Sequence, residues 1–256
     1  MTRLRQGRDG DGHPAIRLEH VTKRFGGRTI LDDVTLEVPA STAFCLLGRS
    51  GTGKSVTLKH IIGLLRPDEG RVLVHGKDVP RLGRQELADV RRSMGFLFQN
   101  AALFDSITVG ENVAFPLRRH TDWSDERIRG VVKTRLAAVG LEADVDTMPA
   151  DLSGGMKKRA GLARAMALDP DILLVDEPSA GLDPITAGEI DQLLVEEKRN
   201  GTTLVVVTHN IPSARHVGDT LAFLYEGRLI AQGTAPELEH SDHEIVRTFM
   251  RSEGAG

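Results

Sequence analysis

Eight consecutive residues have the types and spacing of a phosphate-binding loop: Gly48-Arg49-Ser50-Gly51-Thr52-Gly53-Lys54-Ser55. They fit the pattern G-x-x-x-x-G-K-[ST], in which glycines let successive backbone N–H groups converge on phosphate oxygens. Lys54 would supply a cation for the outer phosphates of a nucleotide, and Ser55 would offer its hydroxyl to Mg²⁺. The pattern therefore predicts a nucleotide site, the alternative being a glycine-rich turn that binds nothing.

Two adjacent carboxylates, Asp176 and Glu177, follow an apolar run at residues 172–175. Such a run is typical of a central parallel strand, and ligands bind at the carboxyl ends of these strands. We expect Asp176 to hold Mg²⁺ through water and Glu177 to orient or deprotonate an attacking water. Neighbouring acids repel each other unless a cation is present, which the nucleotide's Mg²⁺ supplies. The alternative is an acidic pair at the surface.

Three other side chains could reach the same site. His209 follows the apolar run 203–208, at the sheet edge that Glu177 also reaches, and could contact the terminal phosphate. Gln99 follows the short apolar run 94–98 and is equally well an ordinary residue at a strand end. Phe25 ends the first predicted strand, where it could stack on an adenine ring or be a core or turn aromatic.

The elements around these residues predict an α/β fold. Residues 43–47 form a strand before the phosphate loop, and residues 56–65 have the apolar spacing of a helix after it. Two antiparallel strands turned at Gly26-Gly27 precede the loop, so the fold is not plainly doubly wound. Residues 101–150 are mainly helical by pattern, with Ser124 capping the clearest helix. Residues 221–231 predict a hairpin, and one final helix is expected over about 236–251.

Two further helix starts are visible. Ser153 can cap a helix whose first turn contains Gly154 and Gly155, which makes this helix start either a second phosphate site or an ordinary capped helix. In the same helix, residues 157–159 are most simply a solvated basic face. Asp183 caps another helix, with Pro184 at its first position.

Composition limits the class of protein. The 256 residues carry a net charge of −3, which argues against nucleic acid as the main partner. The single cysteine, Cys45, allows no internal disulfide and suits a reducing cytosol. No apolar run approaches the ~18 residues that cross a bilayer, so a membrane role would come through a partner. Residues 1–15 lack the apolar segment of a signal peptide and are expected to be a disordered tail.

The motifs occur in one fixed order that resembles the nucleotide-binding subunit of ATP-binding cassette (ABC) transporters, from Ile16 to about Ala235. The resemblance implies a P-loop ATPase core with an N-terminal antiparallel β-subdomain and an inserted helical subdomain at about 101–165. The ATPase domain would span 16–240, with a C-terminal helix and tail at 241–256.

The resemblance also implies roles for individual residues. The catalytic residues would be Glu177, Gln99 as the Q-loop residue and His209 as the switch histidine. ATP would be bound by Phe25, as the adenine-stacking aromatic, and by Gly48, Arg49, Ser50, Gly51, Thr52, Gly53, Lys54, Ser55 and Val56. Mg²⁺ would be held by Ser55, Gln99 and Asp176. A second copy of the chain would close over the ATP with its signature residues Ser153, Gly154, Gly155 and Met156. Asp183 would belong to the D-loop.

The sequence departs from the commonest family pattern at three places. Phe25 replaces a tyrosine, Met156 replaces the signature glutamine, and residues 180–183 read Ala-Gly-Leu-Asp instead of Ser-Ala-Leu-Asp. The first change retains stacking, the second loses a side-chain contact, and the third puts the D-loop serine contact in doubt. None removes a metal ligand or the base, so an active ATPase is expected.

Three stretches resemble more closely the ATPase of Mce/Mla-type phospholipid transporters: residues 102–113, 152–159 and 181–186. In that case, methionine at position 156 is the residue that this group shares. This resemblance implies a homodimer on the cytoplasmic face of the inner membrane, working with an integral permease, an Mce-domain lipid-binding protein and a small accessory protein.

Three other functions are compatible with parts of the sequence. An ABC ATPase for a different transported substrate is the first alternative, since the substrate path lies in other chains. A soluble ABC ATPase of DNA repair or translation is disfavoured, because the chain contains one cassette and no long coiled coil. A catalytically inactive scaffold is disfavoured by intact Lys54, Ser55, Asp176, Glu177 and His209.

Overall fold

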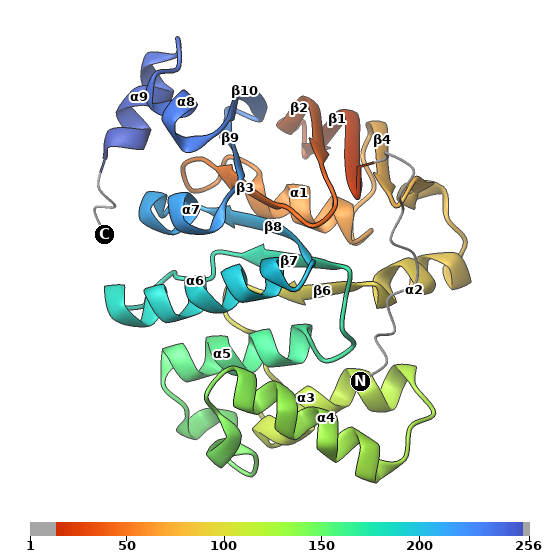
Figure 1. Cartoon of the computed structure of the whole chain (residues 1–256). Helices are drawn as coiled ribbons and strands as arrows, with labels where there is room; N and C mark the ends of the chain where they lie inside the picture. The colour runs from red at the N-terminus through yellow and green to blue at the C-terminus, as the bar shows by residue number, and fades with distance from the viewer. Residues whose placement is uncertain (1–13, 253–256) are drawn as a thin grey trace.

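Two β-sheets form the body of the computed structural model, which describes residues 14–252 (Figure 1). The smaller is antiparallel and has the order β2-β1-β4-β5. Its strands are β1 (Ile16–Phe25), β2 (Arg28–Val38), β4 (Glu69–Val74) and β5 (Lys77–Asp78). Gly26 and Gly27 have φ angles of 54° and 82° at the turn between β1 and β2. The predicted antiparallel unit before the phosphate loop is therefore confirmed.

The larger sheet contains the strands that lead to the predicted site. Its order is β10-β9-β3-β8-β7-β6, and all neighbours are parallel except β9 and β10. The strands are β3 (Ala43–Leu47), β6 (Met94–Leu97), β7 (Ile172–Asp176), β8 (Thr203–Thr208), β9 (Thr220–Tyr225) and β10 (Arg228–Gly233). Every residue of β3, β7 and β8 is buried. Because these strands are parallel, the residues that follow them emerge at one edge of the sheet.

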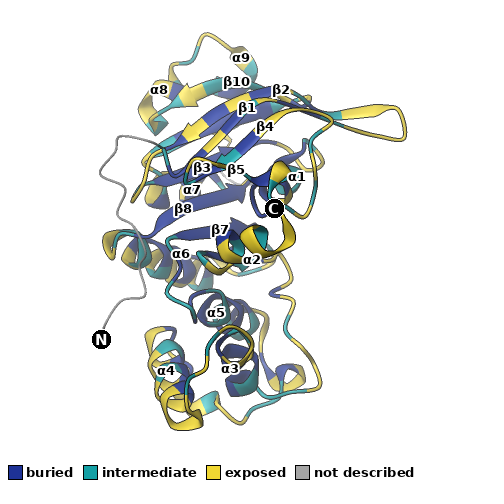
Figure 2. Ribbon diagram, turned by 90° about the vertical axis from the view of Figure 1, so that its right-hand side faces the viewer, coloured by how far each residue is buried: buried dark blue, intermediate teal, exposed yellow. Residues whose placement is uncertain are grey.

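Alternate residues of β3 face two different hydrophobic clusters. Cys45 and Leu47 pack with the helices, and Phe44 and Leu46 pack with the antiparallel sheet. Figure 2 shows the resulting buried strands running through the body. Burial raises the pKa of the Cys45 thiol to about 12, so this side chain is a protonated, apolar filler.

Helices surround the larger sheet and continue away from it. They are α1 (Lys54–Ile61), α2 (Arg84–Arg92), α3 (Val109–His120), α4 (Asp125–Ala138), α5 (Gly154–Ala165), α6 (Pro184–Arg199), α7 (Ile211–Val217), α8 (Ala235–Glu239) and α9 (Glu244–Arg251). Short 3₁₀ turns cover Val79–Arg81, Glu142–Asp144 and Pro149–Asp151. Figure 1 places α3 and α4 on the far side of α5 from the sheet. Within residues 14–252, no helix has the length and apolar character needed to cross a bilayer.

The three predicted helix caps are present. Ser124 Oγ accepts a hydrogen bond from Arg127 N, and Ser153 Oγ accepts one from Met156 N. Asp183 Oδ1 accepts from the first turn of α6, which has Pro184 at its first position. Each cap satisfies a backbone N–H that has no partner inside its helix.

One expectation about the C-terminal end of the chain needs correction. The single final helix is two helices, α8 and α9, separated at residues 240–243. Ser241 Oγ accepts a hydrogen bond from His243 N in this break, a local side-chain bond that competes with helix formation. The tail predicted at 1–15 lies outside the described residues except for Pro14 and Ala15, and Ala15 is buried.

Candidate functional site

The phosphate loop lies between β3 and α1, as its sequence predicts. Gly53 has a φ angle of 108°, a conformation that side chains with a Cβ rarely adopt. A Cβ at Gly48 would lie 2.5 Å from the carbonyl oxygen of Leu224. Two glycines of the loop are therefore required by its backbone path as well as by its expected ligand.

Lys54 is buried at the base of this loop. Its Nζ donates hydrogen bonds to the carbonyl oxygens of Gly48, at 2.8 Å, and Arg49, at 3.1 Å. It also lies 3.3 Å from Glu177 Oε1. A buried ammonium needs compensating acceptors, and here the loop itself and a carboxylate provide them. The lysine is thus held with its charge beside the loop's backbone.

Ser55 and Asp176 meet across the interface between α1 and β7. Ser55 Oγ donates to Asp176 Oδ1 over 2.9 Å. The pKa of Asp176 is raised, mainly by burial, while the Ser55 hydrogen bond opposes the shift and the Glu177 charge adds to it. A hydroxyl and a carboxylate are hard oxygen donors that suit Mg²⁺, an ion that usually takes few protein ligands beside phosphates and water. No cluster of three or more His, Cys, Asp or Glu that could hold a metal occurs in residues 14–252.

Glu177 is the residue on which the site converges. Its side chain is buried, and His209 Nδ1 lies 3.0 Å from Oε2 while Lys54 approaches Oε1. The backbone N–H of His209 also donates to Oε2, over 3.3 Å. The predicted meeting of these two strand-end residues therefore occurs.

The backbone of Glu177 is strained. Its φ angle is +46°, in the left-handed region that costs a non-glycine residue about 1–3 kcal/mol. The N–H of Glu177 donates to the carbonyl oxygen of Val207 over 2.9 Å, which fixes the residue against β8. Such strain persists where surrounding contacts hold the conformation.

A cleft of about 800 Å³ joins most of the predicted residues of this half of the site, while Gly48, Thr52 and Asp176 do not line it. Phe25, Gln99, Glu177 and His209 line it together with Arg49, Ser50, Gly51, Gly53, Lys54, Ser55 and Val56. Phe25 and Gln99 are exposed at its rim, and Lys23 Nζ lies 5.2 Å from the centre of the Phe25 ring. The cleft is large enough for a drug-sized ligand. Six separate sequence segments contribute to its lining, at residues 25–30, 49–56, 99, 177, 209 and 249–252.

The second group of predicted residues lies elsewhere. Ser153, Gly154, Gly155, Met156 and Asp183 do not line the cleft. They occupy the first turns and caps of α5 and α6, where Ser153, Gly154 and Asp183 are exposed. Gly155 is buried against α6, since a Cβ there would lie 2.5 Å from Thr186 Cγ2. One chain therefore carries two separated sets of phosphate-type features.

The sequence did not indicate four residues at or beside the cleft: Lys158, Phe249, Ser252, and Ile30 of β2, which lines the cleft. Lys158 was expected on a solvated face but is only 5% exposed, and its Nζ donates to the carbonyl oxygen of Glu177 over 2.9 Å. Burial lowers its pKa. Phe249 and Ser252, from the end of α9, also line the cleft. The spacing of Gly155, Lys158 and Leu162 on one helix face was a usable signal for Lys158. No local pattern in the sequence indicated that Phe249 and Ser252 would reach the cleft.

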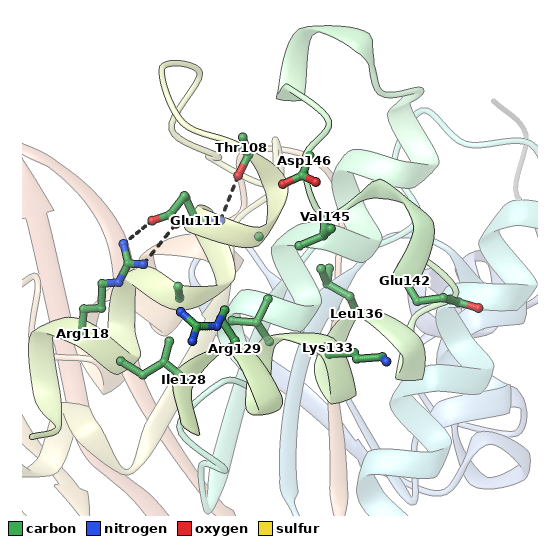
Figure 3. Close-up of a pocket in the computed structure, with 13 residues that line it drawn as sticks. Thr108, Glu111, Arg118, Ile128, Arg129, Lys133, Leu136, Glu142, Val145 and Asp146 are labelled. Carbon is green, nitrogen blue, oxygen red and sulfur yellow. Dashed lines mark hydrogen bonds and ion pairs between the residues drawn. The ribbon is translucent and has the colours of Figure 1, made fainter. Parts of the chain in front are cut away.

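A separate pocket of about 380 Å³ lies between α3 and α4 (Figure 3). Its floor is apolar, with Ile128, Val132 and Leu136, while Arg118 at the rim is paired with Glu111. It contains none of the predicted site residues, so it is distinct from the cleft.

Comparisons with known proteins agree on one family. The family model described as "ABC transporter" matches residues 31–180. The chain is 44% identical over 252 residues to the "Probable ribonucleotide transport ATP-binding protein mkl" of Mycobacterium leprae, covering 96% of this chain and 73% of that protein. It is 40% identical over 236 residues to the "Intermembrane phospholipid transport system ATP-binding protein MlaF" of Escherichia coli K12, covering 92% and 88%.

A solved dimeric ATP-binding cassette, in a post-hydrolysis state bound to ADP and Pi, has a similar structure. The TM-score is 0.80 at 34% sequence identity, over 86% of this chain and 98% of that one. Its fold therefore corresponds to nearly the whole described part of this chain.

Proposed function

Because this chain belongs to the ABC transporter family as an ATP-hydrolysing motor subunit, we propose that it powers phospholipid transport through a separate integral permease. The observation that carries the ATPase chemistry is the convergence of Lys54 and His209 on Glu177 in a cleft walled by the phosphate loop. The lipid assignment is supported by the MlaF relatives, which match this chain over most of both lengths. The relative named for ribonucleotide transport extends further beyond the match.

ATP is bound, in this proposal, by the residues that line the cleft. Phe25 stacks on the adenine, and the backbone of residues 48–56 cradles the phosphates with Lys54 as their cation. Ser55, Asp176 and Gln99 hold Mg²⁺, since they offer hydroxyl, carboxylate and amide oxygens. When bound, Mg²⁺ neutralises charge on the β- and γ-phosphates.

Glu177 and His209 carry the chemical step in the proposal. Glu177 accepts a proton from a water whose oxygen forms a bond to the γ-phosphorus. The bond between that phosphorus and the bridging oxygen breaks, and ADP leaves with the bonding electrons. His209 holds the Glu177 carboxylate and steadies the γ-phosphate. A positioned base of this kind contributes ~10²–10⁴ in rate.

A second copy of the chain completes each site. We assign Ser153, Gly154, Gly155 and Met156 of that copy to the far side of the nucleotide, with Asp183 capping the adjacent helix. The support is that these residues are separated from the cleft in their own chain, and that the similar cassette structure is a dimer. Bare N–H groups at a helix start favour phosphate.

The remaining partners follow from the transporter assignment. We propose that the permease docks on the helical unit near the exposed aromatics Phe98, Phe104 and Phe115, which would place the chain on the cytoplasmic face of the membrane. An Mce-domain lipid-binding protein and a small accessory protein complete the complex. For this role we divide the chain into an ATPase domain at 16–240, a helical insert at about 101–165, and a C-terminal helix and tail at 241–256.

Replacement of Glu177 by glutamine tests the chemistry. Glu177→Gln keeps the shape of the side chain but removes the base, so we expect ATP binding to persist, turnover to fall ~10²–10⁴-fold, and an ATP-bound dimer to accumulate. Size-exclusion chromatography and nucleotide content measure the dimer. Normal turnover by this variant would overturn the role of Glu177.

The lipid assignment needs its own test. The chain co-expressed with its permease and reconstituted in vesicles should move a fluorescent phospholipid in an ATP-dependent way, and Glu177→Gln should abolish that movement. Uptake of radiolabelled ribonucleotides instead, with no lipid movement, would refute it.

A further inference from the structure

Lys158 is a buried cation next to a catalytic backbone. It lies in α5, is almost completely shielded from solvent, and donates from Nζ to the carbonyl oxygen of Glu177 over 2.9 Å. Burying an ammonium is costly unless an acceptor compensates for the lost water. A lysine whose function was solubility would extend into solvent, as long charged side chains normally do. The contact with Glu177 is therefore a specific one.

The contact with Lys158 is one of several hydrogen bonds that restrain the backbone of Glu177. The N–H of Glu177 donates to Val207 of β8. Its carbonyl oxygen accepts from Lys158 of α5 over 2.9 Å and from the backbone N–H of Ala180 over a longer 3.3 Å. Between these bonds, the residue adopts its left-handed backbone conformation. The direction of the Glu177 carboxylate depends on that backbone, because the Cα–Cβ bond turns with φ. Loss of the Lys158 bond would leave only the longer Ala180 contact on the carbonyl oxygen, which weakens the restraint that keeps this residue from relaxing toward an ordinary conformation.

The helix that provides the lysine also carries the predicted signature. Ser153 caps α5, and Lys158 lies in the second turn of the same helix. Gly155, between them, packs tightly on Thr186 of α6. A rigid, tightly packed helix thus connects the residues assigned to the partner's ATP with the backbone of the base in its own cleft.

We propose that Lys158 is a positioning residue for hydrolysis: it fixes the backbone of Glu177 and links the base to the position of α5. This proposal rests on the role given above to Glu177. Lys158 touches no substrate and acts through the Glu177 carbonyl oxygen. We expect the loss of Lys158 to slow the chemical step and to leave ATP affinity unchanged, because affinity depends on the phosphate loop and Phe25, which lie on other elements.

The test compares four single variants of the full-length chain. Lys158→Met removes the donor and retains the length of the side chain. Lys158→Arg retains charge and donor capacity. Lys157→Met, at the neighbouring, partly exposed position of the same helix, is the matched control. Glu177→Gln reports whether the base assignment itself holds. Each is measured for ATP affinity with a fluorescent ATP analogue, for ATP turnover, and for thermal unfolding.

We expect Lys158→Met to lower kcat about 10–100-fold, since a displacement of catalytic groups by 1 Å costs up to ~10²-fold. The Kd for the ATP analogue should stay within about threefold, because the phosphate loop is unchanged. Lys158→Arg should have a kcat several-fold above that of Lys158→Met, and Lys157→Met should match wild type. In a Glu177→Gln background, Lys158→Met should add no further loss, because both changes act on one group.

The outcomes distinguish failure of the positioning role of Lys158 from failure of the role of Glu177 as the base. Near-normal turnover of Lys158→Met beside an inactive Glu177→Gln would overturn the positioning role alone. Active Glu177→Gln would overturn the base assignment and, with it, this proposal. If Lys158→Met and Lys158→Arg both unfold early and lose ATP affinity in parallel with activity, the lysine is structural and the proposal is wrong.

Discussion

Gly155 offers the sharpest test of whether the start of α5 acts on a partner's nucleotide or only packs. A Cβ at this position would lie 2.5 Å from Thr186 Cγ2, well inside normal contact distance. Thr186 cannot easily rotate away, since its Oγ1 donates to Asp183 Oδ2 over 2.6 Å. Gly155→Ala therefore forces a clash between α5 and α6. The proposed dimer predicts a second penalty, because the new methyl group would lie beside backbone N–H groups assigned to phosphate.

The loss of stability caused by the clash can be reversed by a second substitution, whereas the loss of activity at the partner's nucleotide cannot. Overpacking costs about 1–3 kcal/mol, and replacing glycine by alanine inside a helix returns about 1 kcal/mol. The net loss of stability is then about 0–2 kcal/mol, which lowers Tm by about 2–4 °C for each kcal/mol in a chain of this size. Thr186→Ser deletes the clashing methyl group and retains the hydroxyl bonded to Asp183. It loses about 0.8 kcal/mol of burial, so Gly155→Ala with Thr186→Ser should have nearly wild-type stability.

Calorimetry and ATP turnover on the same samples decide the question. We expect the double variant to regain its Tm while its turnover remains at least tenfold reduced, with ATP affinity of the isolated chain unchanged. Thr186→Ser alone is the control and should be close to wild type in both measurements. Recovery of turnover together with Tm would show that Gly155 serves packing alone, and would refute its place in the partner's site.

Two further predictions follow from other parts of the site. Hydrogen bonds from the Thr186 hydroxyl and the α6 backbone lower the pKa of Asp183 below its unfolded value of about 3.9, so its stabilising charge is fully present above that pH and is lost as the pH falls below it. Asp183→Asn, which retains a capping oxygen, should therefore be less stable than wild type at pH 7 by urea unfolding, and the difference should shrink below about pH 4; a constant difference would contradict the charge effect. At the rim of the cleft, Phe25→Ala should raise the KM for ATP by up to about tenfold, since stacking is worth about 0.5–1.5 kcal/mol, while Phe25→Tyr should stay closer to wild type. Equal KM values for the two variants would argue against adenine stacking.

Local patterns predicted the parts of the site that one chain segment builds. The phosphate loop needs only its own glycines, a strand before it and a helix after it, and all are contiguous at 43–61. The approach of His209 to Glu177 was also predictable, because both follow strands that must end at one edge of a parallel sheet. The capping residues of α4, α5 and α6 were identified for the same reason: each cap is a contact within a few residues.

Contacts between distant segments were not predictable in this way. Phe249 and Ser252 reach the cleft because α9 folds back on the body, where Phe249 meets Phe223 edge to face at 4.8 Å. The break before α9 was also missed, although residues 239–244 are all polar and interrupt the apolar pattern there. Burial of Val246 and Met250 sets the direction of α9, because most helical stability comes from tertiary packing.

Lys158 was partly predictable. Its spacing along α5 indicates a buried helix face, but its basic neighbours suggested a solvated one. Three consecutive basic residues suggest a solvated face, but a helix exposes only part of its circumference, so three successive positions cannot all point the same way. Gly155, Lys158 and Leu162 are three and four residues apart, which places them on one face, and all three are buried. A lysine on such a face must find an acceptor or remain neutral. The acceptor is the carbonyl oxygen of Glu177, the strained residue after β7. The lysine that the sequence places on a solvated face is therefore buried in the fold, in contact with the backbone of the proposed base.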